Sequence, residues 1–401
     1  FIQGPPGSGK STVAAAAICD LLHAGKRVGV LSTGHKAIHH LLHKVEACAR
    51  ERGFRFRGLY KHSEGNGESQ YRSKLAEPMI DSIDDNDAIE QSDCGLVGGT
   101  SWLFSREGMT GALDYLFVDE AGQVSLADAV AVSAAARNVV LLGDPSQLAQ
   151  VSQGAHPVHA GDSVLEHLLG DRNTIPPDRG IFLDVSYRMH PDICDFVSTS
   201  MYDGRLQAWQ HTARQQIHST HLRGSGLRYA AMRHEGNSRE SREEADWIAG
   251  EIAHLLEGTL TDCDGLTRRL APSDVIVVTP YNAQRRLISR VLRDAGIDVA
   301  VGTVDKFQGQ EAYVVFYSMA TSSGSDLPRD IDFLFDRNRF NVAVSRARAL
   351  AVLVASERLA DIRCTSVEQI ATLSLMCGFI ERAEPLACIP AMQQSIVQTS
   401  T

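Results

Sequence analysis

Long apolar runs are missing from this 401-residue sequence, and none approaches the roughly 20 residues that a helix needs to cross a bilayer. There is also no basic segment followed by an apolar one, the pattern of a secretory leader. Gly/Ser and Pro tracts long enough to indicate disorder are absent as well. We therefore expect a folded, cytoplasmic protein that is neither secreted nor bound to a membrane.

The sequence also lacks paired cysteines. It contains eight cysteines but no CxxC pair, and their spacing resembles neither a zinc site nor an iron–sulfur site. Reduced, buried thiols in a reducing compartment are the expected state. His39, His40 and His43 lie close together in the sequence, but without a facing carboxylate or thiol we interpret them as the solvated face of a helix. Zinc is therefore not expected.

Basic residues do not predominate: 39 Lys and Arg stand against 49 Asp and Glu, giving a formal net charge of −10. This balance argues mildly against indiscriminate binding to phosphate backbones, but it does not exclude a local basic groove. A nuclease site is missing too, since acids such as Asp81, Asp84 and Asp85 lack a matching strand-borne acid and lysine. Cleavage of nucleic acid would need a nuclease or accessory domain ahead of this sequence.

Short runs rich in β-branched residues recur between helical stretches, which predicts βαβ units, an α/β fold and parallel sheets. The first helix is expected over Ser11–His23, ended by Gly25. The predicted strands are Arg27–Thr33, Leu113–Asp119, Asn138–Gly143, Asp274–Thr279, Val299–Val304, Ala312–Met319 and Leu350–Ala355.

A chain of this length is expected to form two domains. We place the boundary near Arg179, after the stretch Thr174–Asp178 with its two prolines. The first domain would comprise residues 1–179 and the second residues 180–363. Residues 364–401 would form a C-terminal helix and a polar tail.

Two regions resemble insertions. Residues 50–93 are polar and contain the acidic run Asp81–Asp87, which we interpret as a solvated loop. Residues 208–267 are mixed, with a helix expected over Ser241–Leu256. Only three residues precede Gly4 and there is no initiator Met, so we expect the first domain to be incomplete at its N-terminus.

A glycine-rich segment at residues 4–11, GPPGSGKS, matches the phosphate-binding pattern GxxxxGK[ST]. Gly7 and Gly9 let the backbone turn tightly, so that amide N–H groups converge on phosphates at a helix N-terminus. Lys10 would bridge the β- and γ-phosphates, and Ser11 would bind Mg²⁺. The residues expected to bind the nucleotide are Gly7, Ser8, Gly9, Lys10, Ser11 and Thr12. Alone, this motif does not separate a kinase from a GTPase or a motor.

Two adjacent acids end the apolar run at residues 113–119. Asp119 would hold Mg²⁺ directly or through water, while Glu120 would orient and deprotonate the attacking water. Adjacent acids at a strand end are often only surface charge. That alternative weakens because Gly143–Leu148, GDPSQL, ends the next strand, and such folds build their sites at the carboxyl ends of parallel strands. Gln147 is placed to sense the γ-phosphate.

Arginines far from the glycine-rich segment complete the pattern. Arg188, in YRMHP, and Arg346, in NVAVSRAR, lie in the second half of the chain. Guanidinium groups supplied by another domain stabilise charge on a transferred phosphoryl group. Either arginine alone would more simply be a surface residue.

The ordered set GPPGSGKST, DEAGQ, GDPSQL, YRMHP, TPYNAQ, TVDKFQGQE and NVAVSRAR resembles superfamily 1 helicases of the nonsense-mediated-decay (Upf-like) type. The resemblance covers most of residues 1–356. It implies two tandem RecA-like P-loop domains, ATP and Mg²⁺ bound in the cleft between them, and a single strand of nucleic acid crossing both. Enzymes of this group move 5′ to 3′.

The resemblance also assigns roles by position. Lys10, Ser11, Asp119, Glu120 and Gln147 would form the first-domain half of the ATP site, and Arg188 and Arg346 would contact the γ-phosphate. Tyr187 would stack on adenine and Glu311 would approach the ribose, while Arg348 either takes part or packs within its domain. Thr100, Thr279, Pro280 and Thr303 would contact the nucleic-acid strand. Trp102 either stacks on a base or packs in the core.

The stretch Asp326–Arg348 more narrowly resembles bacterial helicase halves fused behind a RecB-like nuclease. Two departures from the family stand out. The glutamine-containing adenine motif that precedes the phosphate loop in relatives is absent, and Gly34-His35 stand where relatives commonly place Ser-Asn. His35 or Lys36 would then supply the phosphate contact, unless both side chains simply face solvent.

These features together predict an ATP-hydrolysing helicase or translocase on single-stranded nucleic acid, with DNA weakly favoured over RNA and no oligomer required. An ATP-gated clamp that binds without unwinding is the alternative. A small-molecule kinase would leave Arg188 and Arg346 without a role.

Overall fold

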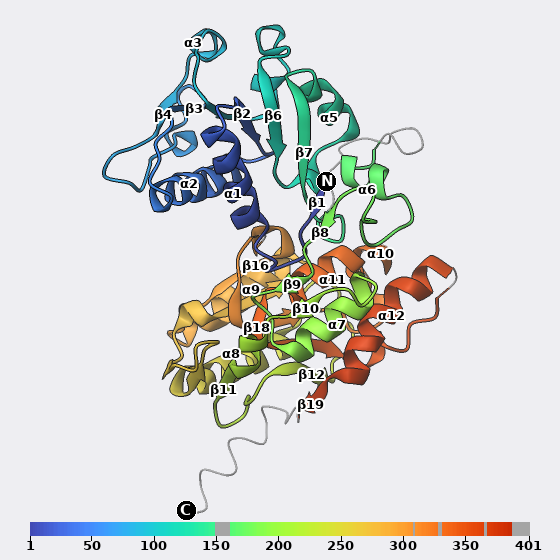
Figure 1. Ribbon diagram of the computed structural model, residues 1–401. Helices are drawn as coiled ribbons and strands as arrows, with labels where there is room; N and C mark the ends of the chain where they lie inside the picture. Colours follow the sequence, from blue (N-terminus) through green and yellow to red (C-terminus); the bar gives the residue numbers. More distant parts are fainter. Residues whose placement is uncertain (149–160, 308, 328–330, 365–366, 387–401) are drawn as a thin grey trace, which may run out of the picture. The chain divides into compact units, whose positions relative to one another are not determined.

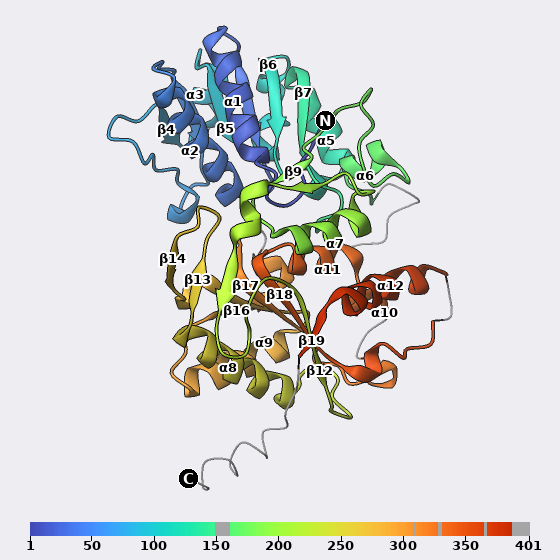
Figure 2. The same ribbon diagram turned by 60° about the horizontal axis from the view of Figure 1, so that its bottom comes forward.

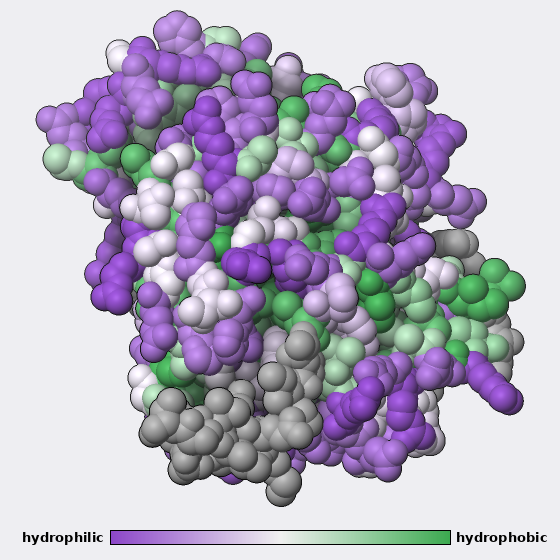
Figure 3. Space-filling view, turned by 90° about the horizontal axis from the view of Figure 1, so that it is seen from below, coloured by the Kyte–Doolittle hydropathy of each residue, from purple (hydrophilic) through white to green (hydrophobic). Residues whose placement is uncertain are grey.

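The computed structural model describes residues 1–148, 161–307, 309–327, 331–364 and 367–386. The chain folds into two compact units, Phe1–Asp184 and Val185–Thr401 (Figure 1). No helix of the described residues is long and apolar enough to cross a membrane. The face drawn in Figure 3 is mainly hydrophilic, with apolar side chains gathered in a few groups.

The first unit is built on an eight-stranded sheet in the order β4-β3-β5-β2-β6-β7-β1-β8, and all its strand pairs are parallel. Its strands are β1 Ile2–Gln3, β2 Val28–Leu31, β3 Gly58–Lys61, β4 Ile80–Ile83, β5 Leu96–Gly99, β6 Leu113–Val118, β7 Ala136–Gly143 and β8 Ile181–Phe182. Its helices are α1 Lys10–His23, α2 His35–Glu51, α3 Asn86–Glu90, α4 Ser101–Phe104, α5 Leu126–Ser133 and α6 Val164–Leu169.

Helices cover both faces of this sheet, because successive side chains of each central strand point to opposite faces. On β6, Phe117 packs with the core beneath α1 and α2, whereas Leu116 and Val118 pack with the core beneath α4, α5 and α6. Figures 1 and 2 show α1 and α2 together on one side of the sheet and α5 on the other. The apolar runs of the sequence are explained by this double coverage.

Residues 50–93 differ from the expected polar insertion. They supply β3 and β4, which extend the sheet beyond β5. The acidic run Asp81–Asp87 was wrongly interpreted as a loop, since it contains the end of β4 and the start of α3, where Asp85 caps the helix by accepting from the amides of Asp87 and Ala88. Most of its acids do face solvent, which suits an edge strand.

The second unit has a six-stranded parallel sheet in the order β16-β15-β17-β18-β12-β19. Its strands are β12 Gly226–Met232, β15 Val275–Thr279, β16 Ala300–Thr303, β17 Ala312–Ser318, β18 Ala347–Ser356 and β19 Glu384–Leu386. Smaller sheets pair β9 Val185–Ser186 with β10 Gln207–Ala208, and join β11 Gln216–His218, β13 Thr259–Thr261 and β14 Thr267–Arg269. Its helices are α7 Pro191–Met201, α8 Arg242–Glu257, α9 Asn282–Asp294, α10 Ile331–Leu334, α11 Arg337–Val344 and α12 Val367–Arg382.

This sheet is also covered on both faces. One core lies between the sheet and α8 and α9, and it includes Ile248 and Ile288. On the other face, Phe196, Phe340 and Phe379 of α7, α11 and α12 meet edge to face. The predicted α/β class with parallel sheets is confirmed.

The two ends of the second unit add to the prediction. Residues 180–184 belong with the first unit, since β8 pairs with β1, whereas the sequence places the boundary near Arg179. The predicted C-terminal helix is present as α12, and β19 after it joins the sheet beside β12. The predicted polar tail falls on residues 387–401, outside the described residues.

Candidate active site

The phosphate loop connects β1 to α1 and owes its shape to glycine. Gly7 and Gly9 have φ angles of 75° and 77°, in the left-handed region that other residues avoid. A Cβ at Gly4 would lie 2.8 Å from Cβ of Lys10, so the loop can close over the start of the helix only with glycine there. Ser8 is buried and its Oγ has no hydrogen-bond partner. The loop is therefore a backbone cradle at a helix N-terminus.

The acid pair faces this loop. The ammonium Nζ of Lys10 lies 3.6 Å from Oε1 of Glu120. Asp119 is buried, and its Oδ1 accepts from the amide of Glu120 at 2.9 Å. Glu120 adopts a left-handed backbone with φ 53°, a conformation that costs a non-glycine residue energy and is typical of functional sites. The strand end thus turns its two carboxylates toward the phosphate loop.

The charges in this group alter one another. Burial raises the pKa of Asp119 to about 6 against the attraction of Lys10. Burial by itself would lower the pKa of Lys10, but attraction to Glu120, Asp119 and Asp144 outweighs it, and the pKa is raised. Lys10 therefore stays charged, with three carboxylates close to it.

A second lysine touches the loop from α2. Nζ of Lys44 donates to Oγ1 of Thr12 at 2.8 Å. Partial burial lowers the pKa of Lys44, and attraction to Asp119 opposes that change. Lys44 was not singled out from the sequence, because it lies on an ordinary amphipathic helix and only the packing of α1 against α2 brings it to Thr12.

Gln147 follows β7, the strand between β6 and β1. Its Nε2 donates to Oδ2 of Asp144 at 3.0 Å, and Oδ1 of Asp144 accepts from the amide of Ser146. Asp144 is another residue that the sequence analysis left without a role, although it ends a strand beside the acid pair. The ends of β1, β7 and β6 therefore carry the predicted loop, sensor and acids side by side.

These residues fit a magnesium nucleotide. The loop offers left-handed glycines, converging amides and a buried hydroxyl of Ser8 without a partner, which suits phosphate oxygens. The hydroxyl of Ser11 and the carboxylate of Asp119 are the hard oxygen donors that Mg²⁺ prefers. These two side chains are the ones that would hold the ion.

In the second unit, the predicted arginines gather at the amino ends of the sheet strands. The phosphate loop and acids of the first unit instead follow carboxyl ends. Nε of Arg188 donates to Oε2 of Glu311 at 2.6 Å, and Nη1 donates to the carbonyl of Ser345 at 3.0 Å. Burial alone would raise the pKa of Glu311, but Arg188, Arg348 and Arg346 hold it below its usual value. Glu311 thus lies with the arginines in one cluster, and Tyr187 immediately precedes Arg188 in the chain.

Arg346 is not the surface residue that the simpler alternative suggested. It is 2% exposed, and its guanidinium donates to the carbonyls of Val342 at 3.1 Å and Gln310 at 3.2 Å. Carbonyl oxygens can hold a buried guanidinium in one orientation, because its five N–H groups form a rigid fork. Sequence alone could not reveal this burial.

Arg348 packs within its own unit. Its guanidinium lies 4.5 Å from the ring centre of Tyr313, and it binds Oε1 of Gln215 at 3.1 Å and Oε1 of Glu311 at 3.4 Å. Gln215, which is fully buried, also donates to the carbonyl of Arg188 at 2.9 Å. It thereby links the segments that carry the two arginines.

Tyr187 presents its ring to solvent, with 53% of the residue exposed. Trp209 lies 5.7 Å from it between ring centres, and His211 stacks on Trp209 at 4.2 Å. Neither of these two neighbours was predicted from the sequence, since both lie in the mixed region 208–267. Together the three rings form an aromatic group suited to a purine face.

Of the residues expected to touch a strand of nucleic acid, one lies in the first unit and three lie in the second. Thr279 and Thr303 are register partners at the ends of β15 and β16. Thr279 and Pro280 are buried, and Oγ1 of Thr279 has no hydrogen-bond partner, so Thr303 is the more accessible of the three. Thr100 is partly exposed at the end of β5. Gln284, from the same motif as Thr279, is buried.

The role of Gln284 is therefore internal. Its Oε1 accepts from the amide of Ser241 at 2.8 Å, and its Nε2 donates to Oγ of Ser318 at 2.9 Å. Ser318 in turn donates to the buried carboxylate of Glu244, which also binds Nε2 of His234 at 3.0 Å. This polar network joins the end of β17 and the segment after β12 to the starts of α8 and α9.

Two of the three histidines of α2 are not solvated as predicted. His39 and His43 are only partly exposed: Nε2 of His39 contacts the carbonyl of Ser69 at 3.2 Å, and Nδ1 of His43 contacts the hydroxyl of Tyr71 at 3.0 Å. Burial lowers the pKa of both histidines. They are not a solvated face, because the segment containing β3 and β4 packs over this side of α2. Only His40 is exposed.

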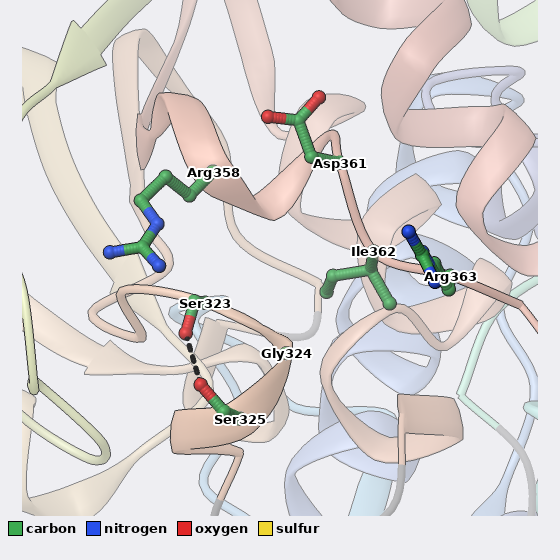
Figure 4. A pocket seen from close by; sticks show the side chains of 7 residues that line it. All are labelled: Ser323, Gly324, Ser325, Arg358, Asp361, Ile362 and Arg363. Atoms are coloured by element: carbon green, nitrogen blue, oxygen red, sulfur yellow. Dashed lines mark hydrogen bonds between the residues drawn. The ribbon is translucent and has the colours of Figure 1, made fainter.

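Beyond these groups, a cavity of about 530 Å³ opens in the second unit after β17 and β18 (Figure 4). Ser323 and Ser325 are hydrogen-bonded to each other at 2.8 Å on one side of it, and Arg358 and Arg363 lie on others. Arg358 is paired with Glu235 at 3.2 Å. The charge of Arg358 is thus offset, and none of the predicted site residues lines this cavity.

The chain is similar in sequence to proteins of known families. Two family models, each described as an AAA domain, match residues 1–160 and residues 160–358. The 3'-5' exoribonuclease HELZ2 of Mus musculus is 30% identical over 62% of this chain and 9% of its own length. The regulator of nonsense transcripts 1 homolog of Drosophila melanogaster is 26% identical over 90% of this chain and 33% of its own length.

Among solved structures, the arterivirus nonstructural protein 10 helicase in complex with DNA covers 93% of this chain and 62% of its own, at 16% identity and a TM-score of 0.48. The chain spans about a tenth of the length of the HELZ2 relative and about a third of the length of the regulator of nonsense transcripts 1 homolog.

Proposed function

Because this chain belongs to the superfamily 1 helicases of the nonsense-mediated-decay type, we propose that it hydrolyses ATP to move along single-stranded nucleic acid, 5′ to 3′, and to separate paired strands. The observation that carries this proposal is the grouping at three neighbouring strand ends of the first unit. There the phosphate loop with Lys10, the acids Asp119 and Glu120, and Gln147 converge.

The chemistry assigned to this unit is general-base hydrolysis. Glu120 would orient and deprotonate the attacking water, and Gln147 would sense the γ-phosphate. Bound Mg²⁺ would supply charge neutralisation at the β- and γ-phosphate oxygens. Lys10 would also neutralise negative charge on the phosphates, since its raised pKa keeps it protonated at neutral pH.

The arginines of the second unit would supply the remaining positive charge. Arg188 and Arg346 lie in one cluster with Glu311, and both are oriented by carbonyl groups. Guanidinium groups held this way suit the charge that spreads over a transferred phosphoryl group. Tyr187 would stack on the adenine, its exposed ring being free to do so.

Hydrolysis would be coupled to movement through a shift in population between two states that grip the strand differently. The residues proposed to contact the strand are Thr100, Thr279, Pro280 and Thr303. Thr100 and Thr303 are the accessible ones. Contacts of this kind go mainly to the backbone. We propose DNA as the preferred strand, on the narrower resemblance of Asp326–Arg348 to bacterial helicase halves.

The proposal is tested by ATPase assays with and without single-stranded oligonucleotides. Hydrolysis is expected to rise on adding the strand, and Lys10→Ala is expected to abolish it. A rate that ignores single strands, or that survives Lys10→Ala, contradicts the proposal. Matched dT and rU oligonucleotides test the preference for DNA.

A strand-displacement assay decides whether the motor unwinds. A labelled oligonucleotide annealed next to a 5′ single-stranded overhang is expected to be released in the presence of ATP, and one next to a 3′ overhang is not. Stimulated hydrolysis without release from either substrate would identify a clamp instead.

A further inference from the structure

Trp102 is the most exposed large hydrophobic residue among the described residues, with 84% of it accessible. The chain has three tryptophans, and the other two, Trp209 and Trp247, are partly buried. A tryptophan this exposed leaves most of a large apolar surface in water, which is unfavourable until a bound partner covers that surface.

The position of Trp102 is rigid. It lies on α4, where the next two residues, Leu103 and Phe104, are 2% and 1% exposed and form part of the core. The amide of Leu103 donates to the carbonyl of Thr100 at 3.0 Å, and a Cβ at Gly99 would lie 2.7 Å from Cδ2 of Leu103. The backbone that carries the indole is therefore fixed, although the indole itself is in solvent.

The surroundings of Trp102 are polar and partly basic. It follows β5, whose neighbours are β3 and β2. At the carboxyl ends of these strands, Lys61 ends β3 and lies opposite Gly99, since Tyr60 and Gly98 are register partners. Lys36, which is exposed, lies in the first turn of the helix that follows β2. Hydroxyls come from Thr100 and from Ser101 beside it.

This combination suits one flat, unpaired base better than a protein partner. Within residues 28–36, 58–63 and 96–106, Trp102 is the one exposed large hydrophobic residue, whereas protein interfaces need a contiguous apolar patch. Every base has a π-face that can stack on an indole, and lysines nearby can hold the flanking phosphates.

We propose that Trp102 is a stacking platform for an unpaired base of the single strand, with Lys61 and Lys36 holding the phosphates on either side. The inference rests on the proposed function and adds to it a contact to a base, where the other contacts go to the backbone. Because stacking does not read base identity, the platform grips any sequence and resists slipping of the strand.

The test uses the full chain and two labelled strands of equal length, one of dT and one with abasic residues in place of the bases. Fluorescence anisotropy gives the Kd for each. Trp102→Ala is expected to weaken binding of the dT strand by about 5- to 100-fold, the range for loss of one stacked base. Binding of the abasic strand, which keeps the phosphates and lacks the π-faces, is expected to stay nearly unchanged.

Two further variants complete the design. Trp102→Phe keeps a π-face and is expected to recover most of the affinity for dT. Leu266→Ala removes another exposed apolar side chain, 66% accessible and in the other unit, and is expected to bind like the wild type. Thermal unfolding of Trp102→Ala should match that of the wild type, since Leu103 and Phe104 still anchor α4.

Each outcome has one meaning. Equal affinity of the wild type and Trp102→Ala for dT overturns the platform, and so does an equal loss for the dT and abasic strands. If the wild type binds neither strand and neither strand stimulates its ATPase, the proposed function itself fails, and the platform fails with it.

Discussion

The two units present their charged groups in different ways. In the first, the phosphate loop, Gln147 and the acid pair follow the carboxyl ends of parallel strands, and glycines with positive φ shape the backbone around them. In the second, Glu311 and Arg346 immediately precede the register partners Ala312 and Ala347, at the amino ends of β17 and β18. The first unit offers a cradle, and the second offers oriented guanidinium groups.

This difference suggests a division of labour. A backbone cradle with Lys10 can bind phosphates within the first unit, whereas we propose that the arginines held by carbonyls and by Glu311 contribute charge to the hydrolytic step. The cradle with Lys10 should therefore govern nucleotide affinity, and the arginines, acting with Glu120, should govern the rate of hydrolysis.

Arg346→Ala should give the largest effect. We expect kcat to fall by about 10³-fold or more, the range for loss of an arginine finger, with nucleotide affinity changed only a few-fold. Single-turnover hydrolysis and binding of a fluorescent ATP analogue measure the two quantities. Because Arg346 is buried, Arg346→Lys serves as a second variant that keeps the charge but loses the fork. Wild-type kcat in both variants would show that Arg346 has no part in hydrolysis.

Lys10→Ala should instead weaken nucleotide binding. Removing a lysine that faces Glu120 and the phosphate loop costs about 2–5 kcal/mol when a charged contact is lost, or roughly 30- to 4,000-fold in Kd. Lys44→Ala is the matched control, since Lys44 also touches the loop but only through Thr12. Its Kd should rise less than tenfold. Similar losses in the two variants would mean that the loop responds to total charge and not to Lys10 itself.

Glu311→Gln should have a smaller effect on kcat, about tenfold or less, because Arg188 keeps its bond to the carbonyl of Ser345. The isosteric amide removes the charge that attracts both Arg188 and Arg348. Steady-state ATPase assays at saturating ATP measure this change. A loss as large as that of Arg346→Ala would place Glu311 among the groups that act directly on the nucleotide.

The smallest predicted effect concerns pH. Asp119 has a pKa raised to about 6, so between pH 4 and 6 the folded protein binds more protons than the unfolded chain. Stability from this group is full at low pH and is lost as pH rises through 6. Relative to Asp119→Asn, the wild type should lose about 1 kcal/mol of unfolding free energy between pH 5 and 7.5. Urea unfolding of the two proteins tests this, and a pH-independent difference between them would contradict it.

Much of the fold follows from the sequence, because buried parallel strands are short apolar runs between helices. The strands predicted at Arg27–Thr33, Leu113–Asp119 and Asn138–Gly143 are present as β2, β6 and β7, with ends displaced by at most two residues. Six other strands of the two main sheets were missed, namely β3, β4, β5, β8, β12 and β19. The polar surroundings of β3 and β4 and the mixed composition of residues 208–267 hide their alternation.

The candidate site was predictable only in its local parts. The phosphate loop and the acid pair are written in consecutive residues, and the strand order then places them together. The burial of Arg346, the contact of Lys44 with Thr12 and the burial of Thr279 depend on packing between distant segments. No local pattern reports such contacts.

The claim that both units act on one nucleotide is tested most directly by a double-mutant cycle on kcat, using Glu120→Gln, Arg346→Ala and the two combined. Residues that serve the same chemical step give strongly non-additive losses. We predict that the double variant is scarcely slower than the slower of the two single variants. Losses that multiply in the double variant would show that Glu120 and Arg346 act independently, and would contradict the account.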